Sequence, residues 1–290
     1  MALLRSELRR ALSRLRLGLS PLAQSHDPGG RRSRQKGTSV EFSEYREYEP
    51  GDDYRHIDWN LYARLDRLFV RLFVEEKSQR VNVLLDTSRS MARGVPPKIE
   101  YGRQLAAALG LVALWSGEEV RAGAAAETLA WQTPYWRGRQ WVGPYFHALE
   151  RVRPEGETRL GDALGAWARA AGRADSNFLI TDLLDPAWPE ALTALAHTCR
   201  TPVLIQLLDR EDWDPSFLGD CDLVDAESGE RLHLELDEPV RAAYRETALA
   251  WLAAVRVQAS AAGIVCIQLD TSLPLEELLL KEMRKRGVLR

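Results

Sequence analysis

The sequence predicts an α/β protein with a doubly wound, mainly parallel sheet that carries helices on both faces. Three short apolar runs, VNVLL at 81–85, NFLIT at 177–181 and VLIQLL at 203–208, have the length and composition of strands buried inside such a sheet. Segments of helical length and spacing stand between them, and strands that alternate with helices favour parallel pairing. With 290 residues, 45% of them hydrophobic, the chain can form one large domain and a small additional module.

The remaining strands follow from composition and from turn signals. Strands are expected at residues 68–76, 118–126, 128–134 and 264–269. The first of these, LFVRLFVEE, is rich in the β-branched and aromatic residues that strands prefer. Residues 221–236 are expected to form a hairpin that turns at Ser228-Gly229.

Six helices complete the expected pattern. They are predicted at residues 97–115, 140–152, 159–171, 189–199, 237–263 and 274–286, where apolar residues recur at helical spacing. The first begins at Pro97 and is followed by Gly117, the usual order of these two helix boundary residues.

The N-terminal 40 residues differ in charge from the rest of the chain. They carry a net charge of +7, whereas the remaining 250 residues carry −10. Leucines at helical spacing predict an amphipathic helix within residues 3–19, which we expect to dock on the domain; a helix for a partner or a membrane surface is the alternative. Residues 24–39 are polar and are expected to be a linker.

Three parts are therefore expected: a basic helix with its linker at 1–40, a segment at 41–78 packed on the main domain, and the main domain at 79–290. Cys199, Cys221 and Cys266 lie far apart in the sequence, which indicates a reducing compartment rather than a disulfide framework. The longest mainly apolar run, 105–115, is too short to span a bilayer. We expect a cytoplasmic protein without a transmembrane segment.

Oxygen-bearing side chains follow two of the core strands. Asp86 ends the first strand, and Ser88 and Ser90 share one side of the loop after it. Asp182 follows the strand at 177–181, and Thr158 lies in a polar turn before a helix. Ligands bind beyond the carboxyl ends of the strands in such sheets, and Mg²⁺ prefers about six oxygen ligands. These five residues predict a magnesium site, with Mn²⁺ or Ca²⁺ as alternative ions; the other interpretation is that the short polar side chains only cap helices.

The same residues carry a family resemblance. DTSRSM, followed by GETRLGDAL and then LITD, resembles a von Willebrand factor A domain with a metal-ion-dependent adhesion site, over about residues 80–270. The resemblance implies that Ser88, Ser90 and Thr158 contact the metal. It implies that Asp86 and Asp182 act directly or through water, and that a partner's carboxylate completes the coordination.

The segment before that domain narrows the resemblance. EFSEYREYEPGDDYRHIDWNLYAR resembles the signature of the bacterial family called domain of unknown function 58. The matching residues are Phe42, Arg46, Tyr48, Pro50, Gly51, Asp52, Asp53, Arg55, Ile57, Asp58, Trp59, Ala63 and Arg64. Members commonly accompany MoxR-type AAA+ ATPases, which implies a non-enzymatic adaptor in complex assembly or maturation.

Two interpretations of the signature residues stay open. Closely alternating acids and arginines indicate a salt-bridged scaffold around a tight turn, whereas Tyr, Trp and Arg are also enriched at binding hot spots. Scaffolding is favoured for Arg55, Asp58 and Trp59. The full set assigned to one role or the other is Arg46, Tyr48, Asp52, Asp53, Arg55, Asp58, Trp59 and Arg64.

Two other functions are alternatives to the interaction module. A Mg²⁺-dependent phosphoester hydrolase would use the same oxygens, but LLDTSRS lacks a second aspartate of the Asp-x-Asp type, and the sequence has no phosphate-binding Gly-rich loop. The basic stretch RRSRQK at 31–36 suggests nucleic acid or a membrane surface; it lacks interleaved aromatic residues, so no nucleic-acid partner is expected.

Overall fold

The computed structural model describes residues 3–18, 40–75, 78–170 and 174–290. The chain forms two compact units, one of residues 1–25 with 79–290 and one of residues 26–78. The predicted linker at 24–39, including RRSRQK, lies outside the described residues.

The small unit is built on an antiparallel strand pair. Strand β1 (Val40–Glu47) pairs with β2 (Phe69–Glu75), and helix α2 (Trp59–Leu65) lies between them in the sequence. Asp58 caps α2 by accepting hydrogen bonds from the backbone N–H groups of Asn60 and Leu61. The strand predicted at 68–76 and the tight turn predicted within the signature segment, at Pro50-Gly51, are confirmed, and the packing of this unit on the main domain stays a prediction.

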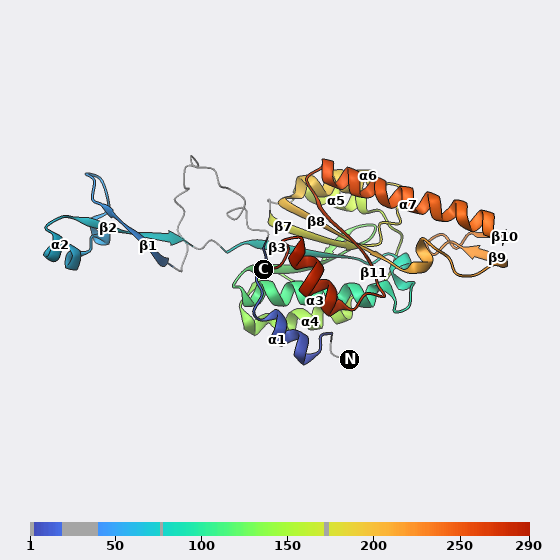
Figure 1. Ribbon diagram of the computed structural model, residues 1–290, viewed down its shortest axis with the longest axis horizontal. Coiled ribbons are helices and arrows are strands. Elements are labelled where there is room, and N and C mark those ends of the chain that lie inside the picture. Colours follow the sequence, from blue (N-terminus) through green and yellow to red (C-terminus); the bar gives the residue numbers. More distant parts are fainter. Residues whose placement is uncertain (1–2, 19–39, 76–77, 171–173) are drawn as a thin grey trace. The chain divides into compact units, whose positions relative to one another are not determined.

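The main unit contains one twisted sheet in the order β11–β8–β7–β3–β4–β5, with β6 also paired to β4 (Figure 1). The five strands from β11 to β4 are parallel to their neighbours, while β5 and β6 run antiparallel to β4. Their bounds are β3 Arg80–Asp86, β4 Glu119–Ala125, β5 Leu129–Trp131, β6 Trp136–Arg137, β7 Ala174–Thr181, β8 Cys199–Leu208 and β11 Val265–Asp270. If the six strands from β11 to β5 are numbered 1 to 6 along the chain, their order across the sheet is 3-2-1-4-5-6, which is the doubly wound order. The chain changes direction across the sheet between β3 and β7.

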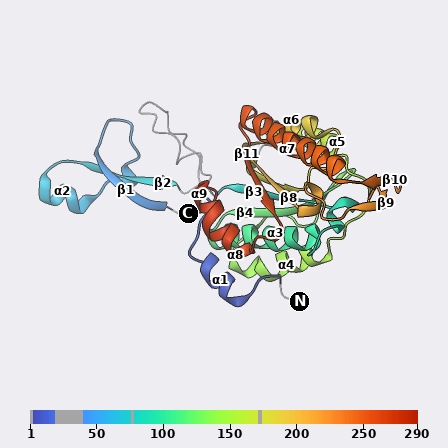
Figure 2. The ribbon, with the colours of Figure 1, turned by 45° about the vertical axis from the view of Figure 1, so that its right-hand side comes forward.

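Helices cover both faces of this sheet, as Figures 1 and 2 show. Helices α3 (Lys98–Trp115) and α4 (Val142–Arg151) lie on one face together with a C-terminal helical segment. That segment comprises α8 (Leu275–Glu277), a π-helical turn (Leu278–Glu282) and α9 (Met283–Lys285). Helices α5 (Leu160–Ala170), α6 (Trp188–Thr198) and α7 (Glu238–Ala261) cover the other face. The predicted fold class, an α/β doubly wound sheet with helices on both faces, is confirmed.

The alternation of side chains along β3 explains these two layers. Val83 and Leu85 belong to the apolar core shared with α3 and α4, while Leu84 belongs to the core shared with α5 and α6. Successive side chains of a strand point to opposite faces, so a strand that is buried on both sides needs an unbroken apolar run. VNVLL supplies that run apart from Asn82, whose side chain donates a hydrogen bond to buried Asn177 on β7 at 2.6 Å.

The N-terminal amphipathic helix docks on the main unit. Helix α1 (Ser6–Leu12) buries Leu8 and Leu12 in the core that contains α3, and Leu4, which precedes the helix, is buried there as well. Leu17 then forms an antiparallel bridge with Leu289, so the described N-terminal residues are tied to the C-terminal end. The docked interpretation of this helix is confirmed.

A two-stranded hairpin stands apart from the main sheet. Strand β9 (Gly219–Val224) pairs antiparallel with β10 (Arg231–Leu236) and turns at residues 225–229, as predicted. Most of its side chains are exposed, and Leu236 is its buried apolar residue.

Candidate metal site at the carboxyl edge of the sheet

Asp86 lies at the carboxyl end of β3, beside the end of β7, where the strand order changes direction. Its side chain is fully buried. One carboxylate oxygen accepts the backbone N–H of Ser88 at 2.8 Å, and the other accepts the hydroxyl of Thr181 at 2.5 Å. Burial, followed by the nearby Asp182 carboxylate, raises the pKa of Asp86, while the hydrogen bonds from Thr181 and Ser88 act in the opposite direction.

Ser88 and Ser90 lie in the short helical turn that follows β3. Both are buried, and their hydroxyls form a hydrogen bond in which the oxygens are 3.0 Å apart. Two neighbouring ligands of an octahedral Mg²⁺ ion, each about 2.1 Å from the metal, are themselves about 3.0 Å apart. The separation of the two hydroxyls therefore fits adjacent positions in such a shell.

Thr158 is brought toward this loop by backbone hydrogen bonds. The N–H of Arg89 donates to the carbonyl of Gly156 at 3.3 Å, and the N–H of Glu155 donates to the carbonyl of Thr87 at 2.6 Å. The loop at 155–158 is thus joined to the loop that carries the two serines. Thr158 itself is buried, and both its N–H and its hydroxyl donate to the carboxylate of Glu227.

Asp182 follows β7 and is fully buried. One of its oxygens accepts the N–H of Leu184 at 3.2 Å, and the other lies 2.8 Å from the ammonium nitrogen of Lys98. Leu183, which follows, has a positive φ of 59°, a strained conformation for a bulky residue that is typical of functional sites. Within the described part of the chain, the Lys98 ammonium is the partner of Asp182 Oδ2, and this oxygen accepts no further hydrogen bond.

Lys98 is the residue of this site that the sequence did not suggest. Its ammonium lies 2.8 Å from Asp182 and 2.9 Å from Asp212, and its side chain is buried at the start of α3. Burial alone would lower the pKa of Lys98, but the two carboxylates outweigh it and the net pKa is raised. With Asp86, three carboxylates face one ammonium, which leaves about two negative charges when all are ionised.

The donor set fits a hard divalent cation. All five predicted ligands offer oxygen, two of them as carboxylates, which is the ligand type that Mg²⁺ selects. Among the described residues, no group of three or more His, Cys, Asp or Glu side chains is arranged to hold a metal ion, so the hydroxyls would be needed as well. The structure thus brings Asp86, Ser88 and Ser90 together, joins the Thr158 loop to them, and sets Asp182 against Lys98.

The signature segment forms its own polar network in the small unit. Arg46 Nη2 donates to both carboxylate oxygens of Asp52, at 2.7 and 2.8 Å, and Arg46 Nη1 lies 3.0 Å from Glu49. Asp52 also accepts the N–H of Glu49 at 2.9 Å, which closes the predicted turn. Asp58 is buried, caps α2 and accepts the hydroxyl of Tyr45 at 2.9 Å. These carboxylates therefore hold the shape of the segment.

Other signature residues are more exposed. Asp53 accepts the N–H of Arg55 at 3.0 Å and is half-exposed. The side chains of Arg55 and Arg64 are exposed, Tyr48 is half-buried, and Trp59 is 62% exposed with an edge-on contact to Tyr62. For this subset the binding interpretation stays open alongside the scaffold interpretation.

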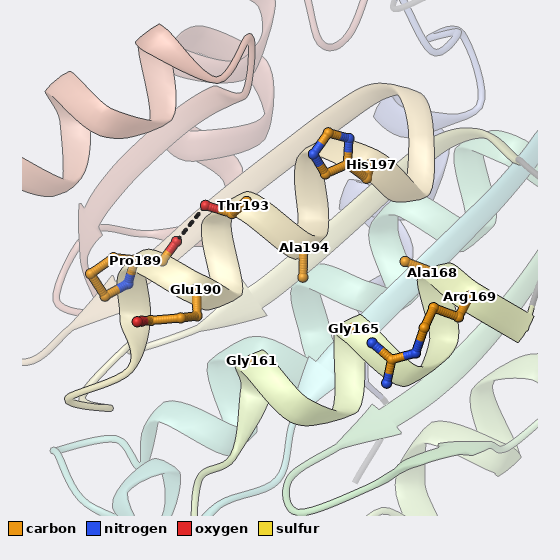
Figure 3. A pocket seen from close by; sticks show the side chains of 9 residues that line it. All are labelled: Gly161, Gly165, Ala168, Arg169, Pro189, Glu190, Thr193, Ala194 and His197. Carbon is orange, nitrogen blue, oxygen red and sulfur yellow. Dashed lines mark hydrogen bonds between the residues drawn. The ribbon is translucent and has the colours of Figure 1, made fainter.

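A surface groove between α5 and α6 is lined by none of the five predicted ligands (Figure 3). Small residues, Gly161, Gly165 and Ala194, line much of it, and the hydroxyl of Thr193 donates to the carbonyl of Pro189. A Cβ atom on Gly161 would lie 3.3 Å from the Cβ of Glu190, so this glycine permits the close approach of the two helices.

Comparison with known proteins identifies the family. The family described as "Protein of unknown function DUF58" matches residues 44–252, most of the chain. This chain belongs to the DUF58 family. It is 29% identical over 262 residues to uncharacterized proteins of Mycobacterium tuberculosis and Mycobacterium bovis, covering 87% of this chain and 82% of each of theirs. The sequence-based resemblance to this family is therefore confirmed.

Solved structures with a similar fold include two bacterial proteins. The conserved hypothetical protein BatB from Bacteroides thetaiotaomicron is 16% identical with a TM-score of 0.44, over 72% of this chain and 99% of that one. A von Willebrand factor type A protein from Catenulispora acidiphila is 18% identical with a TM-score of 0.37, over 62% of this chain and 43% of that one. In the described part of the chain, no helix is both long and apolar enough to cross a membrane.

Proposed function

We propose that this DUF58 protein is a non-enzymatic protein-interaction module that binds Mg²⁺ at the Asp86 site and recognises a partner's Asp or Glu through the metal. The observation that carries the proposal is the pair of hydroxyls on Ser88 and Ser90, 3.0 Å apart beside buried Asp86 at the switch point of the sheet. The two hydroxyls are hydrogen-bonded to each other, and the same separation suits two adjacent ligands of Mg²⁺.

Each side chain has a distinct part in this proposal. Asp86 supplies negative charge and is held in place by Thr181, while Ser88, Ser90 and Thr158 supply neutral oxygens. Asp182 supplies the second carboxylate, oriented by Lys98. Bound Mg²⁺ would offer a coordination position to an incoming carboxylate oxygen. Mn²⁺ and Ca²⁺ are the alternative ions, since both accept oxygen ligands.

A cytoplasmic MoxR-type AAA+ ATPase is the proposed partner, working with this chain as an adaptor in complex assembly or maturation. This choice follows from the family resemblance in the sequence. The three cysteines are free, which agrees with a reducing compartment.

The experiment measures binding of the immobilised protein to a purified MoxR-type ATPase, in Mg²⁺ and after chelation. The variant is Asp86→Asn, which keeps the size of the side chain but removes its charge. Asp162→Asn, an exposed aspartate on α5, is the matched control. Binding in Mg²⁺ should be lost on chelation and in Asp86→Asn, and kept in Asp162→Asn.

Two outcomes would replace the proposal. If the ATPase binds equally well after chelation and to Asp86→Asn, it docks elsewhere on this chain. Steady Mg²⁺-dependent turnover of a phosphoester, lost in Asp182→Ala, would favour a hydrolase instead.

A further inference from the structure

The tip of the β9–β10 hairpin has a fixed backbone. The Asp225 carboxylate accepts hydrogen bonds from the N–H of Glu227 at 3.0 Å and from the N–H and hydroxyl of Ser228 at 2.6 and 2.9 Å. Gly229, with a positive φ of 74°, donates its N–H to the carbonyl of Asp225 at 3.0 Å. The side chain of Asp225 is thus used inside the turn, and that of Glu227 is left to point out of it.

Glu227 contacts two of the loops that carry candidate metal ligands, the loop after β3 and the loop at 155–158. Its Oε2 accepts the N–H of Thr158 at 2.9 Å, and its Oε1 accepts the hydroxyl of Thr158. Its backbone carbonyl accepts a hydrogen bond from Arg89 at 2.7 Å, and Arg89 stands between Ser88 and Ser90 in the sequence. A carboxylate of this chain is therefore already held at one of the five predicted ligands.

The hairpin that carries Glu227 is weakly anchored by apolar packing. Leu223, Val224 and Leu232 are 44%, 47% and 60% exposed. Because the hairpin strands bury little apolar surface, moving the tip would expose little more. Segments with few buried apolar contacts open at low free energy, which is what a releasable contact between Glu227 and Thr158 requires.

We propose that Glu227 is an intramolecular carboxylate ligand of the Asp86 site, which occupies the place of a partner's carboxylate until that partner displaces it. The inference rests on the proposed function and adds regulation to the same site. A tethered ligand has an effective concentration in the millimolar range, so it competes well with a free carboxylate. A latch that is closed for about 90% of the time lowers a partner's apparent affinity about tenfold.

Calorimetric titration with Mg²⁺, in sodium chloride and in sodium acetate of equal ionic strength, tests the inference. Acetate is the external carboxylate. The variants are Glu227→Ala and the neutral isostere Glu227→Gln, and the control is Glu230→Ala, an exposed glutamate at the end of the same turn. In chloride, both Glu227 variants should bind Mg²⁺ about tenfold more weakly than wild type, in the range seen when supporting groups of metal sites are removed. Acetate should restore Mg²⁺ affinity in Glu227→Ala and should leave wild type and Glu230→Ala unchanged.

Hydrogen exchange of the metal-free protein gives a readout that does not depend on the metal. The Thr158 amide donates to Glu227, so it should exchange about tenfold faster in Glu227→Ala, and at the wild-type rate in Glu230→Ala. Circular dichroism should be identical for all four proteins, because the tip lies outside the core.

Three results would overturn the inference, and they also separate it from the proposed function. Equal Mg²⁺ affinity in wild type and Glu227→Ala would show that Glu227 is not a ligand, while the proposed metal site at Asp86 would stand. If Glu227→Ala binds Mg²⁺ more weakly and acetate does not restore the affinity, then Glu227 makes a structural contact and is not a ligand. No Mg²⁺ binding by wild type would overturn both, even if exchange at Thr158 still depended on Glu227.

Discussion

Replacing Lys98 with Met removes the ammonium that the structure sets against Asp182. The side chain of Lys98 is 1% exposed, and its nitrogen lies 2.8 Å from Asp182 and 2.9 Å from Asp212. Met keeps much of the length and apolar stem of Lys but carries no charge. The variant therefore leaves two carboxylates facing each other near Asp86 without compensation.

The size of the effect follows from this burial. Removing one partner of a buried ion pair costs about 3 to 5 kcal/mol, because the remaining charge stays desolvated. For a domain of this size that corresponds to a fall in Tm of roughly 6 to 20 °C. Mg²⁺ at about 100 times its Kd stabilises wild type by about 2.7 kcal/mol. The gain in the free energy of unfolding on Mg²⁺ binding should be larger in Lys98→Met, because the site of this variant is more negative.

Differential scanning calorimetry of chelator-treated protein, with and without added Mg²⁺, measures both effects. Lys281→Met is the matched control, since that exposed lysine pairs with Glu277, at 2.9 Å one helical turn away. Exposed pairs of this kind contribute little, so the control should melt like wild type. The reasoning is refuted if metal-free Lys98→Met also melts like wild type, or if Mg²⁺ raises its Tm by less than it raises that of wild type.

Four further substitutions test helix packing and capping in the two units. Gly110→Ala should lower the free energy of unfolding by about 1 to 3 kcal/mol, because the added Cβ would lie 2.1 Å from the ring of Tyr145. Gly165→Ala on α5 has room for the added Cβ and should raise the free energy of unfolding by up to about 1 kcal/mol. Equal urea midpoints for the two variants would contradict this. Leu12→Ala should cost about 2 to 5 kcal/mol in the same assay, because Leu12 is fully buried against the main unit, and an unchanged midpoint would show that α1 is not docked in solution. Asp58→Ala should destabilise the small unit by about 1 kcal/mol through loss of the α2 cap, seen as faster backbone exchange in that helix, and unaltered exchange would refute the capping role.

Much of the main sheet could be predicted because its strands are buried on both faces. Such strands need unbroken apolar runs, and those runs stand out in the sequence at β3, β7 and β8. The order of the oxygen-bearing residues was also readable, since Asp86 and Asp182 directly follow strands and parallel strands end at one edge. The strand β1 was missed, and in VEFSEYRE charged residues interrupt the apolar and aromatic ones.

The partners of the site residues could not be predicted, because they come from distant parts of the chain. Glu227 is 69 residues from Thr158, and Lys98 is 114 residues from Asp212. Periodicity shows which face of a strand or helix is buried, but not which loop tip meets which turn. Lys98 also departs from the usual exposure of lysine, and it is buried only because two carboxylates compensate it.

In the signature segment, the sequence predicted ion pairs but not the exposure of the aromatic side chains. The tight turn and its salt bridges were predicted from alternating charges, and Arg46 with Asp52 forms the expected pair. Scaffolding was also favoured for Trp59, whose side chain is 62% exposed. Charge alternation predicts that ion pairs form, but it does not indicate which aromatic side chain is left on the surface.

Calorimetric titration of chelator-stripped protein with Mg²⁺, wild type beside Asp86→Ala, is the most direct test of the central claim. The account predicts saturable binding at one site in wild type and none in the variant, with Asp162→Ala, an exposed aspartate, binding like wild type. No binding by wild type, or equal binding by Asp86→Ala, would contradict the assignment of Asp86, Ser88, Ser90, Thr158 and Asp182 to a metal site.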